Sequence, residues 1–259
     1  MTIASASPQI RIAINRFCLG TYISFRSGQA RQRAENRYDP TQCNRPVNRA
    51  MGGMAKRSAA MRRNGRELSM NRDQAWGLLN EYTKNPALIR HALCVEAAMR
   101  HYAQLNNADQ TQWGIAGLLH DFDYERFPTP PEHTREGDKI LRAAGCDEEI
   151  IGAILSHVPW NQDDFPRDRP IRKTLFACDE LCGFIYAAAL VRPDRLTGMH
   201  PSSITKKMKD KAFARAVSRD DIQQGAALLN LPLADHIAHC ITALQSIAGQ
   251  LDLSPPAPA

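Results

Sequence analysis

The sequence predicts an all-α fold, a compact helical bundle of about 180 residues, which is an ordinary size for one domain. From residue 71 onward, apolar residues recur at helical spacing between capping and breaking residues. No alternating run of β-branched residues follows residue 70, so strands are not expected there. With 259 residues, 43% of them hydrophobic, the chain is long enough to bury a sizeable core.

Each helix is predicted from the residues that begin or end it. Asn71, Asn85 and Asp109 have side chains that cap helix N-termini, and a proline follows Asn85 at the first helical position. Gly145 and Pro159 each end a later helix. The expected helices cover about residues 71–82, 85–105, 109–121, 133–144, 147–158, 171–190, 202–209, 219–229 and 233–251, with loops at 128–131 and 161–170.

Charge is distributed unevenly along the chain. The formal net charge is +6, yet residues 1–69 hold 13 Lys and Arg against 3 Asp and Glu, and the remaining residues hold 20 against 24. The basic part lacks helical or strand periodicity, which favours disorder. The sequence therefore predicts a disordered leader at residues 1–69, an all-helical domain at 70–252 and a disordered tail at 253–259.

The leader is open to three interpretations. A basic arm could contact nucleic acid through its phosphates, but few aromatic residues accompany the arginines and no recognition motif is present. An Arg-rich segment with few acidic residues is also typical of an organelle transit peptide. The composition favours the third interpretation, in which translation starts later, for instance at Met70 directly before the first predicted helix.

The sequence also predicts a soluble, cytoplasmic protein without a membrane partner. No apolar run approaches the roughly 18 residues that a membrane span requires, and the N-terminus lacks the layout of a secretory signal. The seven cysteines are scattered and contain no Cys-x-x-Cys pair, which argues against a disulfide framework and a zinc knuckle. The sequence predicts no oligomeric state.

Four histidines and two aspartates form the most informative pattern in the chain. Imidazole and carboxylate groups bind divalent metals, and six of them exceed what one tetrahedral site uses. They fall on five different predicted helices, as a metal site between the helices of a bundle requires. These residues are His91, His120, Asp121, His133, His157 and Asp179.

Three of these groups lie in apolar surroundings. Asp179 lies in the apolar run 175–185, where an unpaired buried carboxylate would cost several kcal/mol. The doublet His120-Asp121 follows the equally apolar run 115–119. A metal ion or a histidine partner would remove that cost.

The ordered series resembles the signature of the HD-domain superfamily of metal-dependent phosphohydrolases. The resemblance covers about residues 85–190, with the local strings Leu118-Leu119-His120-Asp121, Glu132-His133 and Ala153-Ile154-Leu155-Ser156-His157. Segments 179–185 and 206–213 look like a bacterial subgroup known only as hydrolases. The resemblance implies that His91, His120, Asp121 and Asp179 are the common metal ligands, that His133 and His157 are the added ligands of two-metal members, and that Asp121 bridges two ions.

This resemblance implies hydrolysis of a phosphoester by a metal-activated water, with two divalent ions (Mn, Mg, Co, Zn or Fe) as cofactors. The expected substrate is a small phosphorylated molecule, a nucleotide or a related phosphomonoester or phosphodiester. Two alternatives remain open. One is a di-iron oxygenase of the HD type, and the other is a nucleotide-sensing module in which the metal only holds the bundle together.

One departure from the family pattern concerns the residues after the doublet. Many members continue with Ile-Gly-Lys, whereas this chain reads Phe122-Asp123-Tyr124. Asp123 and Glu125 either orient the ligating histidines or are solvated loop carboxylates. The cations considered for contact with substrate phosphate are Lys173, ranked first, then Arg135, Arg192 and Lys206. The predicted catalytic set is therefore Asp121, Asp123 and Lys173.

Overall fold

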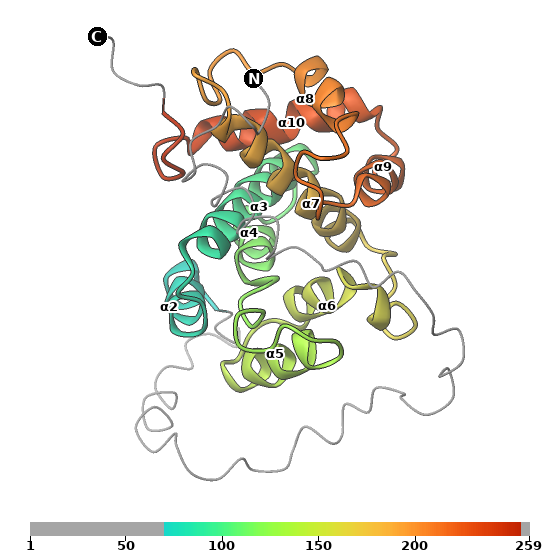
Figure 1. Ribbon diagram of the computed structural model, residues 1–259. Coiled ribbons are helices and arrows are strands. Elements are labelled where there is room, and N and C mark those ends of the chain that lie inside the picture. The colour runs from blue at the N-terminus through green and yellow to red at the C-terminus, as the bar shows by residue number, and fades with distance from the viewer. Residues whose placement is uncertain (1–69, 255–259) are drawn as a thin grey trace.

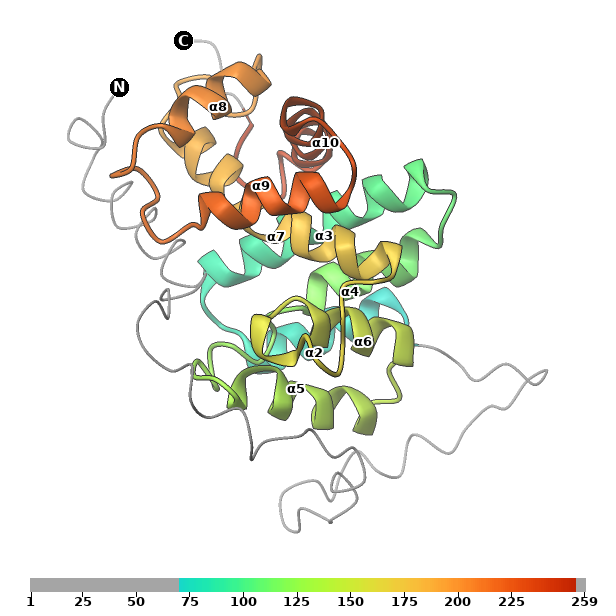
Figure 2. The same cartoon turned by 90° about the vertical axis from the view of Figure 1, so that its right-hand side faces the viewer.

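Helices α3, α4 and α7 run through the middle of the protein, as the computed structural model of residues 70–254 shows (Figure 1). Helices α8, α9 and α10 lie at one end, and α2, α5 and α6 lie at the other (Figure 2). Within the described residues the elements are α2 (Arg72–Tyr82), α3 (Pro86–Leu105), α4 (Gln110–Leu119), α5 (Glu132–Ala143), α6 (Glu148–Ser156), the 3-10 helix η3 (Pro159–Asn161), α7 (Pro170–Leu190), α8 (Pro201–Met208), α9 (Arg219–Leu228) and α10 (Leu233–Ser246). The predicted all-α fold is confirmed. The predicted leader at residues 1–69 and residues 255–259 of the predicted tail lie outside the described part of the chain.

The predicted N-caps are confirmed. Asn71 accepts a hydrogen bond from the backbone N–H of Gln74 (2.9 Å) and returns one to its side chain (2.8 Å), which completes a capping box. The side chain of Asn85 accepts a hydrogen bond from the backbone N–H two residues later (2.9 Å), and the side chain of Asp109 accepts one from the backbone N–H two residues later (2.7 Å). These caps satisfy N–H groups that have no partner inside the helix, so the sequence locates the first three helix starts correctly.

A close approach of α3 and α4 brings together two of the predicted metal ligands. A Cβ atom built on Gly117 would lie 2.8 Å from the backbone oxygen of Val95, so only glycine permits this spacing of the helices. His91 lies one helical turn before Val95, and His120 follows Gly117 by three residues. The crossing therefore places the two imidazoles at the same point between the helices.

The C-terminal part of the fold differs from the prediction. Helix α10 ends at Ser246 and not near Leu251, and the chain then turns back. Leu251 and Leu253 are both fully buried, and the N–H of Leu253 donates to the carbonyl of Ala248 (2.9 Å). The helix end predicted near Leu251 is therefore wrong, because burial of these two leucines against the core outweighs continuation of the helix.

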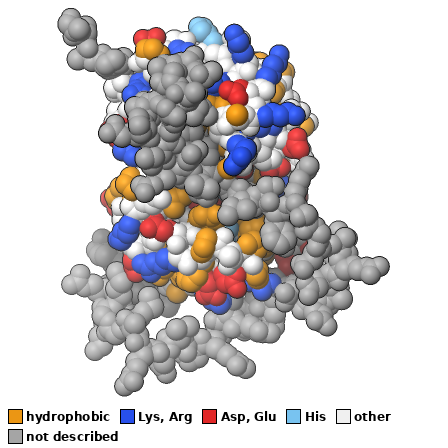
Figure 3. Space-filling view, in the orientation of Figure 1, with side chains coloured by type: hydrophobic (Ala, Val, Ile, Leu, Met, Phe, Trp, Pro, Cys, Tyr) orange, Lys and Arg blue, Asp and Glu red, His pale blue; other side chains and the backbone are white. Residues whose placement is uncertain are grey.

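On the face shown in Figure 3, Lys and Arg side chains gather over α8 and the segment that leads into α9. This stretch includes Lys206, Lys209, Lys211 and Arg215, all exposed, although residues 70–259 carry more acidic than basic groups. Within the described residues, no single helix has the length and apolar character needed to cross a membrane. Helices α9 and α10 meet those criteria only as a pair bent by 97°.

Candidate metal centre

The six predicted ligands form two groups of three in the structure. His91, His120 and Asp179 make up the first group, which draws on α3, the C-cap of α4 and α7. The second group joins the turn after α4, the start of α5 and the C-cap of α6. It consists of Asp121, His133 and His157. Within each group, the ligand atoms all lie within 4.8 Å of one another.

In the first group, two imidazoles share one carboxylate oxygen. The Nε2 atoms of His91 and His120 lie 3.1 Å apart. Asp179 Oδ1 lies 2.9 Å from His91 Nε2 and 3.4 Å from His120 Nε2. Three atoms that can each donate a lone pair to a cation therefore converge on one point.

Asp121 faces both groups. Its Oδ1 atom lies 3.2 Å from Nε2 of His133 and 3.2 Å from Nε2 of His157, while its Oδ2 atom lies 3.5 Å from Nε2 of His120. One carboxylate thus presents a different oxygen to each group. That is the geometry expected of a carboxylate placed between two cations.

Hydrogen bonds on the outer side of the rings determine which nitrogen carries the proton. Nδ1 of His120 donates to the carbonyl of Gly117 (2.8 Å), Nδ1 of His157 donates to the carbonyl of Ile154, and Nδ1 of His133 lies 2.9 Å from Asp123 Oδ1. Because these oxygens only accept, Nε2 of each neutral ring is left as a lone pair.

The lone pairs on the inward-facing Nε2 atoms suit the binding of a metal ion. Nε2 of His133 and Nε2 of His157 are buried and make no hydrogen bond, even though each approaches Asp121 Oδ1 to 3.2 Å. A lone pair facing a carboxylate oxygen is unfavourable unless a proton or a cation lies between them. The donor set, imidazole nitrogen with carboxylate oxygen, is one that Zn, Mn, Fe and Co accept.

The carboxylates of the centre raise the pKa of two of its histidines. Burial lowers the pKa of His120, but Asp121 and Asp179 outweigh it and raise that pKa to about 9. Burial also lowers the pKa of His133, but the nearby carboxylates of Asp121 and Asp123 outweigh it and raise that pKa to about 10. In metal-free protein His120 and His133 therefore hold protons that balance the carboxylates, and bound metal ions would take over that role.

The two carboxylates shift in the opposite direction. Burial alone would raise the pKa of Asp121, but the charge of His120 and the nitrogens of His133 and His157 hold it well below its ordinary value. Burial acts on Asp179 in the same way, and His120 and His91 lower its pKa below the ordinary value. Both carboxylates thus stay ionised, as metal ligands must.

Asp123 is a buried partner of a ligating histidine. Its Oδ1 atom accepts the proton of His133 Nδ1, and its Oδ2 atom accepts from the backbone N–H groups of Thr134 (2.8 Å) and Gly137 (3.1 Å). It is only 1% exposed. Of the two interpretations that the sequence left open for Asp123, the orienting one matches this geometry.

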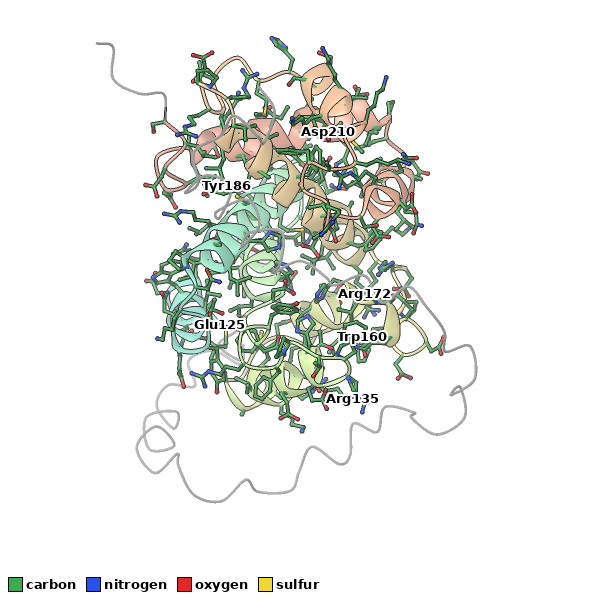
Figure 4. All side chains as sticks on the ribbon, viewed as in Figure 1. Glu125, Arg135, Trp160, Arg172, Tyr186 and Asp210 are labelled. Carbon is green, nitrogen blue, oxygen red and sulfur yellow. The ribbon has the colours of Figure 1, made fainter. Side chains whose placement is uncertain are left out.

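Glu125 is an exposed loop carboxylate, the second of the two interpretations that the sequence left open for it. Its Oε2 atom accepts from the backbone N–H groups of Lys84 (2.7 Å) and Asn85 (2.9 Å). Glu125 lies on the α2 side of the lower half, whereas Trp160 and Arg172 lie on the other side (Figure 4). It therefore ties the turn after the His-Asp doublet to the start of α3, the helix that carries His91.

The start of α5 is distorted at a ligand. A regular helix is predicted from His133, but His133 has ψ 133° and Thr134 has φ 72°, so both depart from helical geometry. The side-chain amide of Asn161 donates to Thr134 Oγ1 (3.1 Å), and Asp123 holds the N–H of Thr134. A left-handed threonine costs on the order of 1–2 kcal/mol, which these hydrogen bonds offset while directing His133 toward Asp121.

The predicted substrate cations lie at different distances from the centre. Lys173 is partly exposed on the first turn of α7, about 9 Å along the helix axis from Asp179 at the usual rise per residue. Arg135 is partly exposed on α5. Arg192 donates to two backbone carbonyls beyond the far end of α7, and Lys206 lies exposed on α8. Lys173 and Arg135 stay predictions, whereas Arg192 and Lys206 belong to the opposite end of the bundle.

Two aromatic rings pack edge-on against His133. The ring of Tyr124 lies 5.2 Å from that of His133, at an interplanar angle of 90°, and Trp160 lies at 6.0 Å and 72°. Burial first, and then the charge of Asp121, raise the pKa of the Tyr124 phenol. The sequence prediction omitted Tyr124, although its place three residues after Asp121 was a usable signal.

The fold and the two ligand groups define a class, the all-helical proteins that bind divalent metals between their helices. Residues 88–180 match the family model of the HD domain, and this span contains all six ligands. No curated protein and no solved structure matches the chain. This part of the chain is therefore similar to an HD domain.

Proposed function

We propose that this protein is a metal-dependent phosphohydrolase that cleaves a phosphoester bond in a small phosphorylated molecule. The observation that carries the proposal is the placement of Asp121, whose two carboxylate oxygens face different ligand groups at 3.2 and 3.5 Å. A single structural metal would need only one of these groups. Paired groups on one carboxylate suit two cations acting on one phosphoryl centre.

The chain's own residues hold and orient this centre. Divalent ions, when bound by the six ligands, supply a water of lowered pKa and positive charge for the phosphoryl oxygens. His120, His133 and His157 keep their protons on Nδ1, so that Nε2 of each ring is directed inward. Asp123 acts through His133 and is a positioning residue. Lys173 and Arg135 are proposed to bind the substrate phosphate. Both are partly exposed, and each lies near the start of a helix that carries a ligand, α7 for Lys173 and α5 for Arg135.

The full chain, purified and analysed for metal, tests the proposal. After loading with Mn²⁺ it is assayed against nucleoside monophosphates, phosphodiesters and small phosphomonoesters. Wild type should release product from at least one class, and Asp121→Ala should lose at least 100-fold in rate and bind fewer ions, because it removes the oxygens that face both groups.

Asp138→Asn is the matched control. Asp138 is as buried as Asp123 but pairs with Arg142 on α5, so the variant should keep both activity and metal content. Equal inactivity of wild type and Asp121→Ala across the whole panel would remove the proposal. Two bound irons with oxygen consumption and no phosphate release would support the oxygenase alternative instead. The small phosphorylated substrate and the cytoplasmic location stay predictions from the sequence.

A further inference from the structure

His157 lies at the C-terminal end of α6, where the helix leaves carbonyl groups without partners. The residue is the C-cap of α6, and its Nδ1 atom donates to the carbonyl of Ile154 in the same turn. The place of the imidazole therefore depends on the geometry of this last turn. The final carbonyls of a helix have no partner inside it and need donors from elsewhere.

One guanidinium binds two of these carbonyls. Nε of Arg167 donates to the carbonyl of Ser156 (3.0 Å), and Nη2 donates to the carbonyl of His157 (2.7 Å). The side-chain amide of Gln162 adds a second donor to Ser156 (2.5 Å) and one to Val158 (3.0 Å). A positive charge at a helix C-terminus is also favourable with respect to the helix dipole.

The same guanidinium stacks on the helix that carries a ligand of the other group. Its central carbon lies 3.5 Å from the centroid of the Phe176 ring. Phe176 is a buried residue of α7, three positions before Asp179. Arg167 thus contacts both the helix end that holds His157 and the helix that holds Asp179.

We propose that Arg167 is a positioning residue that places His157, and with it the second ligand group, relative to α7. The inference rests on the proposed function in one respect, that both ligand groups bind metal. Arginine suits this place because its planar fork donates to two carbonyls while its face stacks on a ring. A lysine ammonium has neither the fork nor the flat face.

Metal stoichiometry of the full chain tests this role. Mn²⁺ alone is titrated into wild type, Arg167→Ala, Arg167→Lys and Arg169→Ala, with calorimetry for stoichiometry and electron paramagnetic resonance for coupling between two ions. Arg169 is the matched control, an exposed neighbour that pairs with Glu149 on the surface. Wild type and Arg169→Ala should bind two coupled ions.

Arg167→Ala and Arg167→Lys should keep the first ion and bind the second about 10 to 100 times more weakly, with loss of the coupled signal, because His157 is no longer held in place. A general loss of structure would weaken both ions alike, and circular dichroism and thermal unfolding of the metal-free variants detect it. If Arg167→Ala fails to fold, the lysine variant and Phe176→Leu, which keeps the carbonyl bonds but removes the stacking ring, provide the test.

Two results with the Arg167 variants would overturn the inference. In one, both Arg167 variants bind two coupled ions with wild-type affinity. In the other, the first and second ions weaken equally in a folded variant. If wild type binds no divalent metal, both the proposed function and this inference are overturned. If wild type binds two ions and the Arg167 variants bind them with the same affinity, the inference alone is overturned.

Discussion

Replacing Asp123 with asparagine is the sharpest test of how the second ligand group is held. The carboxylate accepts three hydrogen bonds, from His133 Nδ1 at 2.9 Å and from two backbone N–H groups at 2.8 and 3.1 Å. Asparagine has nearly the same shape, and its oxygen can still accept from the two backbone groups. Its NH₂ group then faces His133 Nδ1. Because an NH₂ group only donates, Nδ1 must lose its proton in order to accept this hydrogen bond.

The magnitude follows from this change of tautomer. When Nδ1 of His133 accepts, Nε2 carries the proton and has no lone pair for a metal. Loss of such a hydrogen-bonding partner of a ligand costs about 10 to 100-fold in metal affinity, or about 1.4 to 2.7 kcal/mol. The expected effect of Asp123→Asn is therefore a weakened second ion with the first ion retained.

The assay is a competition titration with a chelating dye on full-length protein, which gives a separate affinity for each ion. Asp138→Asn serves as control, because Asp138 is also 1% exposed but pairs with Arg142 through a 2.7 Å contact. This control should change the free energy of unfolding and leave both affinities unchanged. Wild-type affinity for the second ion in Asp123→Asn, or an equal loss in the control, would refute the reasoning.

Three further predictions concern stability and substrate binding. In metal-free protein, the raised pKa values of His120 (about 9) and His133 (about 10) mean that their ion pairs contribute fully below pH 6.5 and are lost as the pH rises through 9 to 10. The unfolding temperature of metal-free protein should then fall over that range, and a flat profile would contradict the assigned pairs. Gly117→Ala should cost about 1–3 kcal/mol in urea unfolding through its clash with α3, whereas Gly77→Ala, with nothing within 4 Å of the added Cβ, should be neutral or stabilising. Tyr124→Phe keeps the ring against His133 but removes the phenol, so it should retain metal. We expect this phenol, beside a ligating histidine, to contact substrate, in which case kcat/KM falls about 10-fold, and an unchanged kcat/KM would exclude that contact.

Much of the helical layout was predictable because it depends on local interactions. A cap such as Asn71 bonds to the backbone three residues later, so its effect is visible in a short stretch of sequence. The end of α10 was predicted wrongly because Leu251 and Leu253 turn back into the core, a preference that helical propensity does not record. The distortion at Thr134 was missed for the same reason, since its partner Asn161 lies 27 residues away.

The all-α class, the helix starts and the six metal-ligand candidates all follow from the sequence alone. They do so because caps act within one turn and because a carboxylate such as Asp179 in an apolar helix needs a partner. The division of the six residues into two groups, with Asp121 between them, and the carboxylate that supports His133 became visible only in the folded chain. The same is true of Arg167, which links the end of α6 to α7. These contacts depend on how helices cross and pack, and that geometry is set by side chains far apart in the chain.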